Sequence, residues 1–195
     1  MSKAEKTRAF IVEKTAPIFN MKGYAGTSLT DMTEATGLTK GSIYGNFENK
    51  DEVALAAFDH NLQKVKSIIK AEMDKRAICK EKLLVYVHVY DNFLHYPFPE
   101  GGCPVLNTAI DADDTHPLLR KKVVDAIIGW KDVIIKLVEK GIASKEFGDG
   151  LNAEQVALTL IAMIEGGIMI SKVTGKVHYR KAVMQSVADY ITGLK

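Results

Sequence analysis

The chain has 195 residues, of which 47% are hydrophobic and 26% are charged, and its formal net charge is +2. These values are typical of a globular protein of one or two domains, and they exclude a disordered or fibrous chain. Charged residues interrupt the apolar runs every few positions, so we expect no membrane-spanning helix. The first ten residues lack the apolar core of a signal peptide, and we therefore expect a cytoplasmic protein.

The positive charge is concentrated at the N-terminus. Residues 1–50 contain seven lysines and arginines against five acidic residues, so they carry the whole net charge of +2, and the rest of the chain is balanced. A mildly basic N-terminal segment is what a DNA-facing region shows, although two charges alone do not separate this from a chance distribution.

Apolar residues recur at helical spacing along most of the chain, and the alternation typical of strands is scarce. A first helix is expected to end at Gly23, because glycine tolerates the left-handed conformation of a helix end. Ser28 opens a short second helix, with Asp31 as its capping-box partner. Asn49 opens a long helix in the same way, with Glu52 three residues on.

Further along, a short helix is expected from Pro104, and apolar stripes predict long helices over residues 80–96, 116–144 and 152–174. A last stripe runs to the C-terminus through Val183, Val187, Tyr190, Ile191 and Leu194. The sequence therefore predicts an all-α protein of about nine helices.

The segment between residues 28 and 47 has the pattern of a helix-turn-helix. Gly37 supplies the turn between two short helices, which lets them cross steeply. Small or apolar residues join these helices at Met32, Ala35, Leu38, Ile43 and Phe47. The polar residues of the second short helix then point outward: Thr39, Lys40, Ser42, Tyr44 and Asn46.

Residues 7–53, "TRAFIVEKTAPIFNMKGYAGTSLTDMTEATGLTKGSIYGNFENKDEV", resemble the DNA-binding head of the TetR/AcrR family of bacterial transcriptional regulators. The motifs that carry the resemblance are Lys-Gly-Tyr, Thr-Ser, Thr-Gly-Leu, Lys-Gly-Ser-Ile-Tyr and Lys-Asp-Glu, in this order. Residues 101–123 resemble, more loosely, a subgroup that includes regulators of drug or electrophile response genes. The resemblance implies a helix-turn-helix DNA-binding domain over residues 1–48 and a helical regulatory and dimerisation domain over residues 49–195.

The resemblance also implies a function. The chain would be a homodimeric, non-enzymatic repressor that a small apolar or aromatic inducer releases from a pseudo-palindromic operator. Together with the outward pattern, it assigns DNA contacts to Thr27, Ser28, Thr39, Lys40, Gly41, Ser42, Tyr44, Asn46 and Lys50. Gly45 departs from the bulky residue often found at its position, which puts direct base reading there in doubt. Taken singly, Ser28 and Thr39 are better explained as helix caps, and Tyr44 as a packing residue; the order and context of the whole set favour DNA contact.

The candidate inducer site lies in the later helices. Tyr86, Tyr90 and Phe93 recur on one helix face, Trp130 lies midway along another helix, and Glu165 is the only charge in "LTLIAMIEGGIMI". Aromatic stripes of this kind more often form a core, and that alternative stays open. The full set of candidate ligand-binding residues is Leu62, Tyr86, Tyr90, Phe93, Asn107, Trp130 and Glu165. Leu62 is included because it lies toward the C-terminal end of the helix that Asn49 opens, which would link this site to the DNA-binding domain. No cofactor is expected.

The two cysteines suggest a competing function. Cys103 follows two glycines at the start of a short helix, where the helix dipole lowers a thiol pKa. With His95 upstream and Asp111 downstream, the sequence contains the residue types of a Cys-His-Asp nucleophilic site. A thiol-based electrophile or redox sensor, or a small cysteine-dependent enzyme, is therefore the alternative. Basic neighbours of Cys79 would favour its thiolate.

The cluster of Asp111, Asp113, Asp114 and His116 raises the question of a metal site. Capping is the favoured explanation, with Asp114 or Thr115 starting the next helix and Pro117 in its first turn. No metal is expected.

Dimerisation is expected through the last two long helices. Gly166 and Gly167 permit close helix approach, and the stripe that includes Val187 and Leu194 has no later element of its own chain to cover it.

Overall fold

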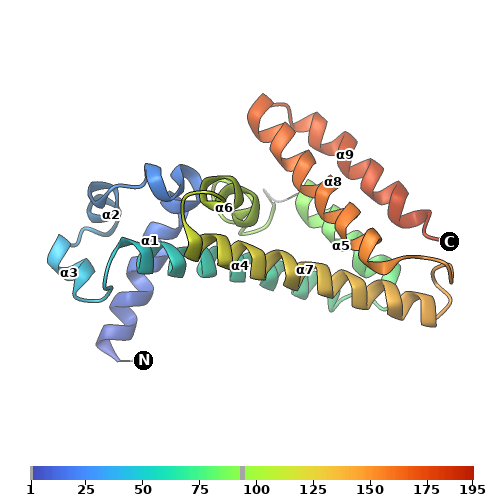
Figure 1. Cartoon of the computed structure of the whole chain (residues 1–195), viewed down its shortest axis with the longest axis horizontal. Coiled ribbons are helices and arrows are strands. Elements are labelled where there is room, and N and C mark those ends of the chain that lie inside the picture. Colours follow the sequence, from blue (N-terminus) through green and yellow to red (C-terminus); the bar gives the residue numbers. More distant parts are fainter. Residues whose placement is uncertain (1, 93–94) are drawn as a thin grey trace. The chain divides into compact units, whose positions relative to one another are not determined.

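The computed structural model describes residues 2–92 and 95–195, and within them the regular elements are nine α-helices (Figure 1). Their bounds are α1 Lys3–Gly26, α2 Leu29–Thr36, α3 Lys40–Tyr44, α4 Lys50–Met73, α5 Cys79–Asp91, α6 Pro104–Ala112, α7 Pro117–Ala143, α8 Ala153–Thr174 and α9 Val177–Thr192. The all-α fold predicted from helical periodicity is confirmed.

Most of the expected helix boundaries are close to those observed, but the helix expected over residues 80–96 ends earlier, because α5 spans Cys79–Asp91. Ser28 caps α2 with the reciprocal hydrogen bonds to Asp31 that define a capping box. Asn49 caps α4 by accepting the Glu52 N–H at 2.9 Å. Gly23 has the expected positive φ of 73°, but α1 does not end there: it kinks and continues to Gly26.

The chain divides into two compact units. The first comprises Met1–Val65 and Pro99–Ala126, and the second comprises Lys66–Phe98 and Ile127–Lys195. The first unit contains the helix-turn-helix together with α6 and the first turns of α7. A DNA-binding domain of residues 1–48 is therefore a smaller segment than the unit in which it packs.

The core of the first unit is formed by apolar side chains that have no solvent exposure. They come from α1, α2, α3 and α4, and include Ile11, Met32, Ile43 and Val53. Two buried polar groups are satisfied inside this core: the Thr15 hydroxyl donates to Ile11 O at 2.8 Å, and the Asn61 amide donates to Ala16 O at 2.9 Å.

The second unit is built on α5, α8 and α9, which pack on one another, with α8 and α9 side by side along their lengths (Figure 1). Gly167 makes this close approach possible, since a Cβ there would lie 2.9 Å from the Val183 side chain. Arg180 of α9 is buried and donates to the backbone carbonyl of Asp91 in α5 at 2.9 Å.

By length and composition alone, α8 would be able to cross a membrane. Its side chains Leu160 and Ile164 are buried in the second unit.

One expectation for α9 is wrong. Val187, Ile191 and Leu194 are buried inside their own chain. They are not left uncovered, because α9 packs against both α5 and α8. Any surface that α9 offers to a second copy must use other residues.

Candidate nucleic-acid interface and effector site

The helix-turn-helix is fixed by local hydrogen bonds. The turn between α2 and α3 is made by Gly37, which has φ 67° and ψ 11° and whose N–H donates to Thr33 O at 2.9 Å. Thr39 then caps α3 by accepting the Ser42 N–H at 3.2 Å. The short helix α3 is buried through Ile43, so its other residues face away from the core.

Most of the predicted DNA contacts are at least partly exposed to solvent. Ser28, Thr39, Lys40, Gly41 and Ser42 are exposed, and Tyr44, Asn46 and Lys50 are half-buried. The capping roles considered for Ser28 and Thr39 are present, since both hydroxyls take part in helix caps. Capping and an exposed position for DNA contact therefore coexist at these residues.

Thr27 differs from the other predicted contacts. It is 1% exposed, and its hydroxyl donates to Gly23 O at 2.6 Å. The Thr27 side chain thus closes the end of α1, its hydroxyl is engaged within the chain, and a contact from Thr27 to DNA stays a prediction.

Arg8 is a residue of this site that the sequence patterns did not single out. Its guanidinium lies over the Phe47 ring, 3.9 Å from the centroid, and donates to Asn46 O and to the Glu52 carboxylate, each at 2.5 Å. Arg8 therefore ties α1 to the segment that joins α3 and α4. The only sequence signal was an arginine one helical turn before the apolar stripe.

Ion pairs and capping bonds hold the flanks of α2. Lys22 lies 2.6 Å from Asp31, and together with the Ser28 amide and hydroxyl it keeps the pKa of Asp31 far below its usual range. This carboxylate is therefore charged at the start of α2, where it also complements the helix dipole.

Tyr24 lies at the centre of a cluster in the first unit. Its hydroxyl donates to Asp51, its ring meets the His116 ring edge-on at 4.3 Å, and Lys50 Nζ lies 4.3 Å from the ring centroid. The hydrogen bond to Asp51 and burial raise the pKa of Tyr24 to about 12. Lys50, expected to contact phosphate, is thus positioned by Tyr24.

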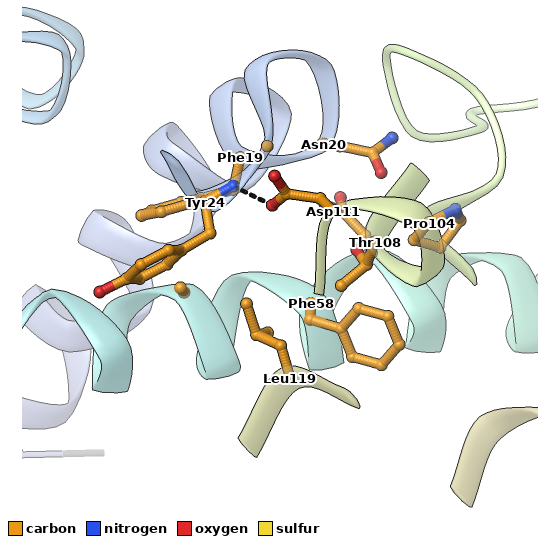
Figure 2. A pocket seen from close by; sticks show the side chains of 11 residues that line it. Phe19, Asn20, Tyr24, Phe58, Pro104, Thr108, Asp111 and Leu119 are labelled. Atoms are coloured by element: carbon orange, nitrogen blue, oxygen red, sulfur yellow. Dashed lines mark hydrogen bonds between the residues drawn. The ribbon is translucent and has the colours of Figure 1, made fainter. Parts of the chain in front are cut away.

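A small pocket lies beside this cluster (Figure 2). Its lining includes Phe19, Tyr24, Phe58, Thr108 and Asp111. The volume of the cavity is about 20 Å³. That is room for a water molecule or two and too little for an inducer.

Three of the expected effector residues meet in the second unit. The Trp130 ring stacks on Tyr90 at 5.8 Å and lies 5.6 Å from the Tyr86 ring. Tyr90 also meets Phe98 edge-on at 5.6 Å. Burial raises the pKa of Tyr86 well above its usual range, although the neighbouring Trp130 indole opposes the shift.

The other expected effector residues are more scattered. One carboxylate oxygen of Glu165 is buried in the second unit. Leu62 and Asn107 belong to the first unit, where the Asn107 amide donates to Asn20 O at 3.0 Å and to Gly101 O at 2.9 Å. Phe93 lies outside the described residues.

Both cysteines are 2% exposed. Burial, together with the Glu146 carboxylate, raises the pKa of Cys79, so the expected activation of its thiolate by basic neighbours is wrong. Cys103 precedes α6 at its N-terminus, but His95 belongs to the other unit, and the Asp111 carboxylate accepts the Tyr24 N–H.

The expected capping of α7 by Asp114 or Thr115 is wrong. His116, rather than Asp114 or Thr115, caps α7, since its Nδ1 accepts the Leu119 N–H at 3.2 Å. Within residues 2–92 and 95–195, no group of three or more His, Cys, Asp or Glu side chains is arranged to hold a metal ion.

The fold is shared with known regulators. A regulator of the TetR family from Cytophaga hutchinsonii is 51% identical, with a TM-score of 0.96, over 100% of this chain and 98% of its own. A TetR regulator from Chloroflexus aurantiacus is 37% identical, with a TM-score of 0.93, over 99% and 98% of the two chains. FadR from Bacillus subtilis, solved in complex with stearoyl-CoA, is 18% identical with a TM-score of 0.77, over 96% and 98%, and shares the fold.

Family models match both parts of the chain. The model of bacterial regulatory proteins of the tetR family matches residues 11–57, and the model of the tetracyclin repressor-like C-terminal domain matches residues 79–187. Such regulators bind DNA and are not enzymes, which excludes the cysteine-dependent enzyme considered as an alternative. With a helix-turn-helix in the first unit and a matching C-terminal domain, the chain belongs to the TetR family of bacterial transcriptional regulators.

Proposed function

We propose that this regulator is a homodimeric repressor that binds a pseudo-palindromic operator in the cytoplasm and is released from it by a small apolar or aromatic molecule. The observation that carries the proposal is the exposed polar surface of the helix-turn-helix, formed by Ser28, Thr39, Lys40 and Ser42. Residues 1–48, together with Lys50 at the start of α4, would supply the DNA contacts, and the rest of residues 49–195 would bind the effector and the second copy.

The DNA contacts follow from exposure and charge. Lys40 and Ser42 reach the major groove from α3, while Tyr44, Asn46 and Lys50 contact the phosphate backbone at its edge. Gly41 has no side chain within 3.4 Å of its would-be Cβ, so backbone and DNA can approach closely there. A five-residue α3 contacts few base pairs, which is why two heads are required for selectivity.

The surface for the second copy is an apolar stripe on α8. Leu158, Ala162, Gly166, Met169 and Val173 follow one another at spacings of four, four, three and four residues, which places them on one helix face. Leu158, Met169 and Val173 are exposed, Val173 by 82%. The small Ala162 and Gly166 between them allow a second α8 to approach closely, so an isologous pairing covers the stripe.

The effector site is proposed at Tyr86, Tyr90 and Trp130. Tyr86 and Tyr90 both contact the Trp130 ring, and Glu165, with one buried carboxylate oxygen, lies on a neighbouring helix of the same unit; this set suits a ligand with few polar groups. FadR from Bacillus subtilis was solved with stearoyl-CoA, of which the long acyl chain, but not the charged coenzyme A part, has this apolar chemistry. The burial of Cys79 and Cys103 gives no support to a thiol sensor.

Selection from a pool of random duplexes tests the proposal. The wild-type protein should enrich an inverted repeat with its half-sites about one helical turn apart or somewhat more. The enriched duplex should be bound with two chains per site. Enrichment of a single unrepeated half-site, or none above the starting pool, would contradict the proposed dimeric repressor.

A further inference from the structure

We propose that Asp111, near the end of α6, is a positioning residue for DNA binding: its carboxylate holds the turn at Gly23 through which the chain enters the helix-turn-helix. Gly23 is the one residue inside α1 with non-helical dihedral angles, at φ 73° and ψ 178°. The direction in which α1 delivers the chain to α2 therefore depends on what fixes this turn.

Asp111 contacts the turn directly, as Figure 2 shows. Its Oδ2 accepts the Tyr24 N–H at 2.6 Å. A Cβ added to Gly23 would lie 3.0 Å from the carboxyl carbon and from both carboxylate oxygens. The left-handed backbone and the closeness of the carboxylate both require glycine at residue 23.

A second side chain from α6 contacts the same part of α1. Asn107, one helical turn before Asp111, donates its Nδ2 to Asn20 O at 3.0 Å. Two polar side chains on one face of α6 thus bind backbone groups of α1 on either side of Gly23. Such paired contacts fix both the position and the direction of the kink.

Tyr24 connects the turn at Gly23 to the far end of the helix-turn-helix, where α4 begins. Its side chain contacts Asp51 and Lys50 in the first turn of α4, which follows α3. The turn held by Asp111 therefore reaches both the entry to α2 and the exit from α3. Movement of the α6 carboxylate would change the pose of the whole α2–α3 pair.

The direction in which DNA affinity changes when the Asp111 carboxylate is removed distinguishes a positioning role from an electrostatic one. Removing a carboxylate from a DNA-binding unit reduces repulsion from phosphates, so a purely electrostatic role predicts tighter binding in the variant. A positioning role predicts weaker binding, because the head loses its pre-organised pose and must recover it on the DNA.

The test compares Asp111→Ala and Asp111→Asn with Asp113→Ala on the duplex enriched by the wild type. Asp113 is exposed at the same helix end, and its carboxylate accepts the Asp114 N–H at 2.9 Å, so it is a matched loss of charge. We expect Asp111→Ala to bind this duplex roughly tenfold more weakly, as for loss of a charged hydrogen bond. The slope of log affinity against log salt concentration should be unchanged. Asp111→Asn keeps an acceptor oxygen and should stay near the wild type, and Asp113→Ala should bind equally or more tightly.

Hydrogen exchange gives a direct readout, since the Tyr24 amide should exchange faster in Asp111→Ala and not in Asp113→Ala. Unchanged or tighter DNA binding by Asp111→Ala, or equal weakening by Asp113→Ala or Asp111→Asn, overturns the proposal. If Asp111→Ala does not fold, Asp111→Glu replaces it: the longer side chain displaces the turn, and wild-type affinity would then overturn the proposal. The wild type serves as reference, so these outcomes are separate from failure of the repressor function itself.

Discussion

The guanidinium of Arg8 lies over the ring of Phe47, 3.9 Å from its centroid, and this contact joins α1 to the segment between α3 and α4. The same guanidinium donates to Asn46 O and to Glu52. A planar, delocalised cation suits this combination of ring stacking and two directed hydrogen bonds, whereas an ammonium group does not.

Arg8→Lys and Arg8→Ala should therefore both lower the thermal midpoint, by about a few degrees, and weaken DNA binding. Lys6→Ala removes the same charge from an exposed position of α1 and is the control. Calorimetry and a binding titration measure the two effects. If Arg8→Lys matches the wild type in both measurements, the ring stacking and the two directed hydrogen bonds of Arg8 contribute nothing beyond its positive charge.

Acid should loosen the start of α2. Lys22 and the Ser28 cap lower the pKa of Asp31 from its usual 3.8, so the folded chain takes up this proton only at lower pH than the unfolded chain. The stabilisation is present above pH 3.8 and is lost as the pH falls through the depressed folded pKa.

The variant Asp31→Asn should consequently show a shallower loss of stability than the wild type as the pH falls below about 4. Urea unfolding at several pH values measures this difference. Asp113→Asn is the matched control, since it replaces an exposed carboxylate that accepts the Asp114 N–H at 2.9 Å. Parallel profiles for Asp31→Asn and the wild type would show that the Lys22 and Ser28 contacts do not persist in solution.

Helical periodicity and capping residues predicted most of this fold because both are local. Ser28, Gly37 and Asn49 each act within three or four residues of their own position, and each has the expected role. Long stripes in α7 and α8 likewise gave ends within about one or two residues of those observed.

The errors come from contacts between segments distant in sequence. Periodicity shows that Val187 and Ile191 share a face but not that α5 and α8 of the same chain cover that face. The Arg8 and Asp111 contacts span 44 and 87 residues, and no pattern along the chain predicts either contact. Burial of Cys79 against Glu146 reverses what its basic sequence neighbours suggested.

Lys50 tests the assigned phosphate contacts. Lys50→Ala should weaken binding to every duplex and reduce the slope of log affinity against log salt by about 2 per dimer, near 0.9 for each lost phosphate contact. Lys64→Ala is the control because Lys64 is exposed on α4, away from the helix-turn-helix. An unchanged slope for Lys50→Ala would leave Lys50 as a support for the Tyr24 ring only.

Dimerisation should depend on the exposed stripe of α8. Met169→Glu combined with Val173→Glu should give monomers by sedimentation, because like charges would face each other across an isologous interface. Ile110→Glu is the matched control, since Ile110 is an apolar residue of α6 that is 73% exposed. A dimer that survives the double substitution, or a monomer produced by Ile110→Glu, would assign the interface to another surface.

Trp130 is the only tryptophan in the chain, so its fluorescence reports directly on the proposed effector site. A ligand that inserts among Tyr86, Tyr90 and Trp130 must separate rings that now lie 5.6 and 5.8 Å apart, and the emission should change on binding. Stearoyl-CoA and a panel of hydrophobic aromatic compounds are suitable probes. A ligand identified in this way should also release the enriched duplex in a binding assay.

Two variants decide how that release occurs. Trp130→Ala should weaken ligand-dependent release by roughly tenfold or more, since removing a large buried ring at a binding site typically costs 2 kcal/mol or more, whereas Cys103→Ser should leave it unchanged. DNA binding without ligand should be the same in both, because the helix-turn-helix is not altered. Loss of release in Cys103→Ser alone would instead assign the response to the thiol, despite its burial. Release unaffected by Trp130→Ala would exclude the aromatic cluster as the effector site, and its contacts would then be those of a core.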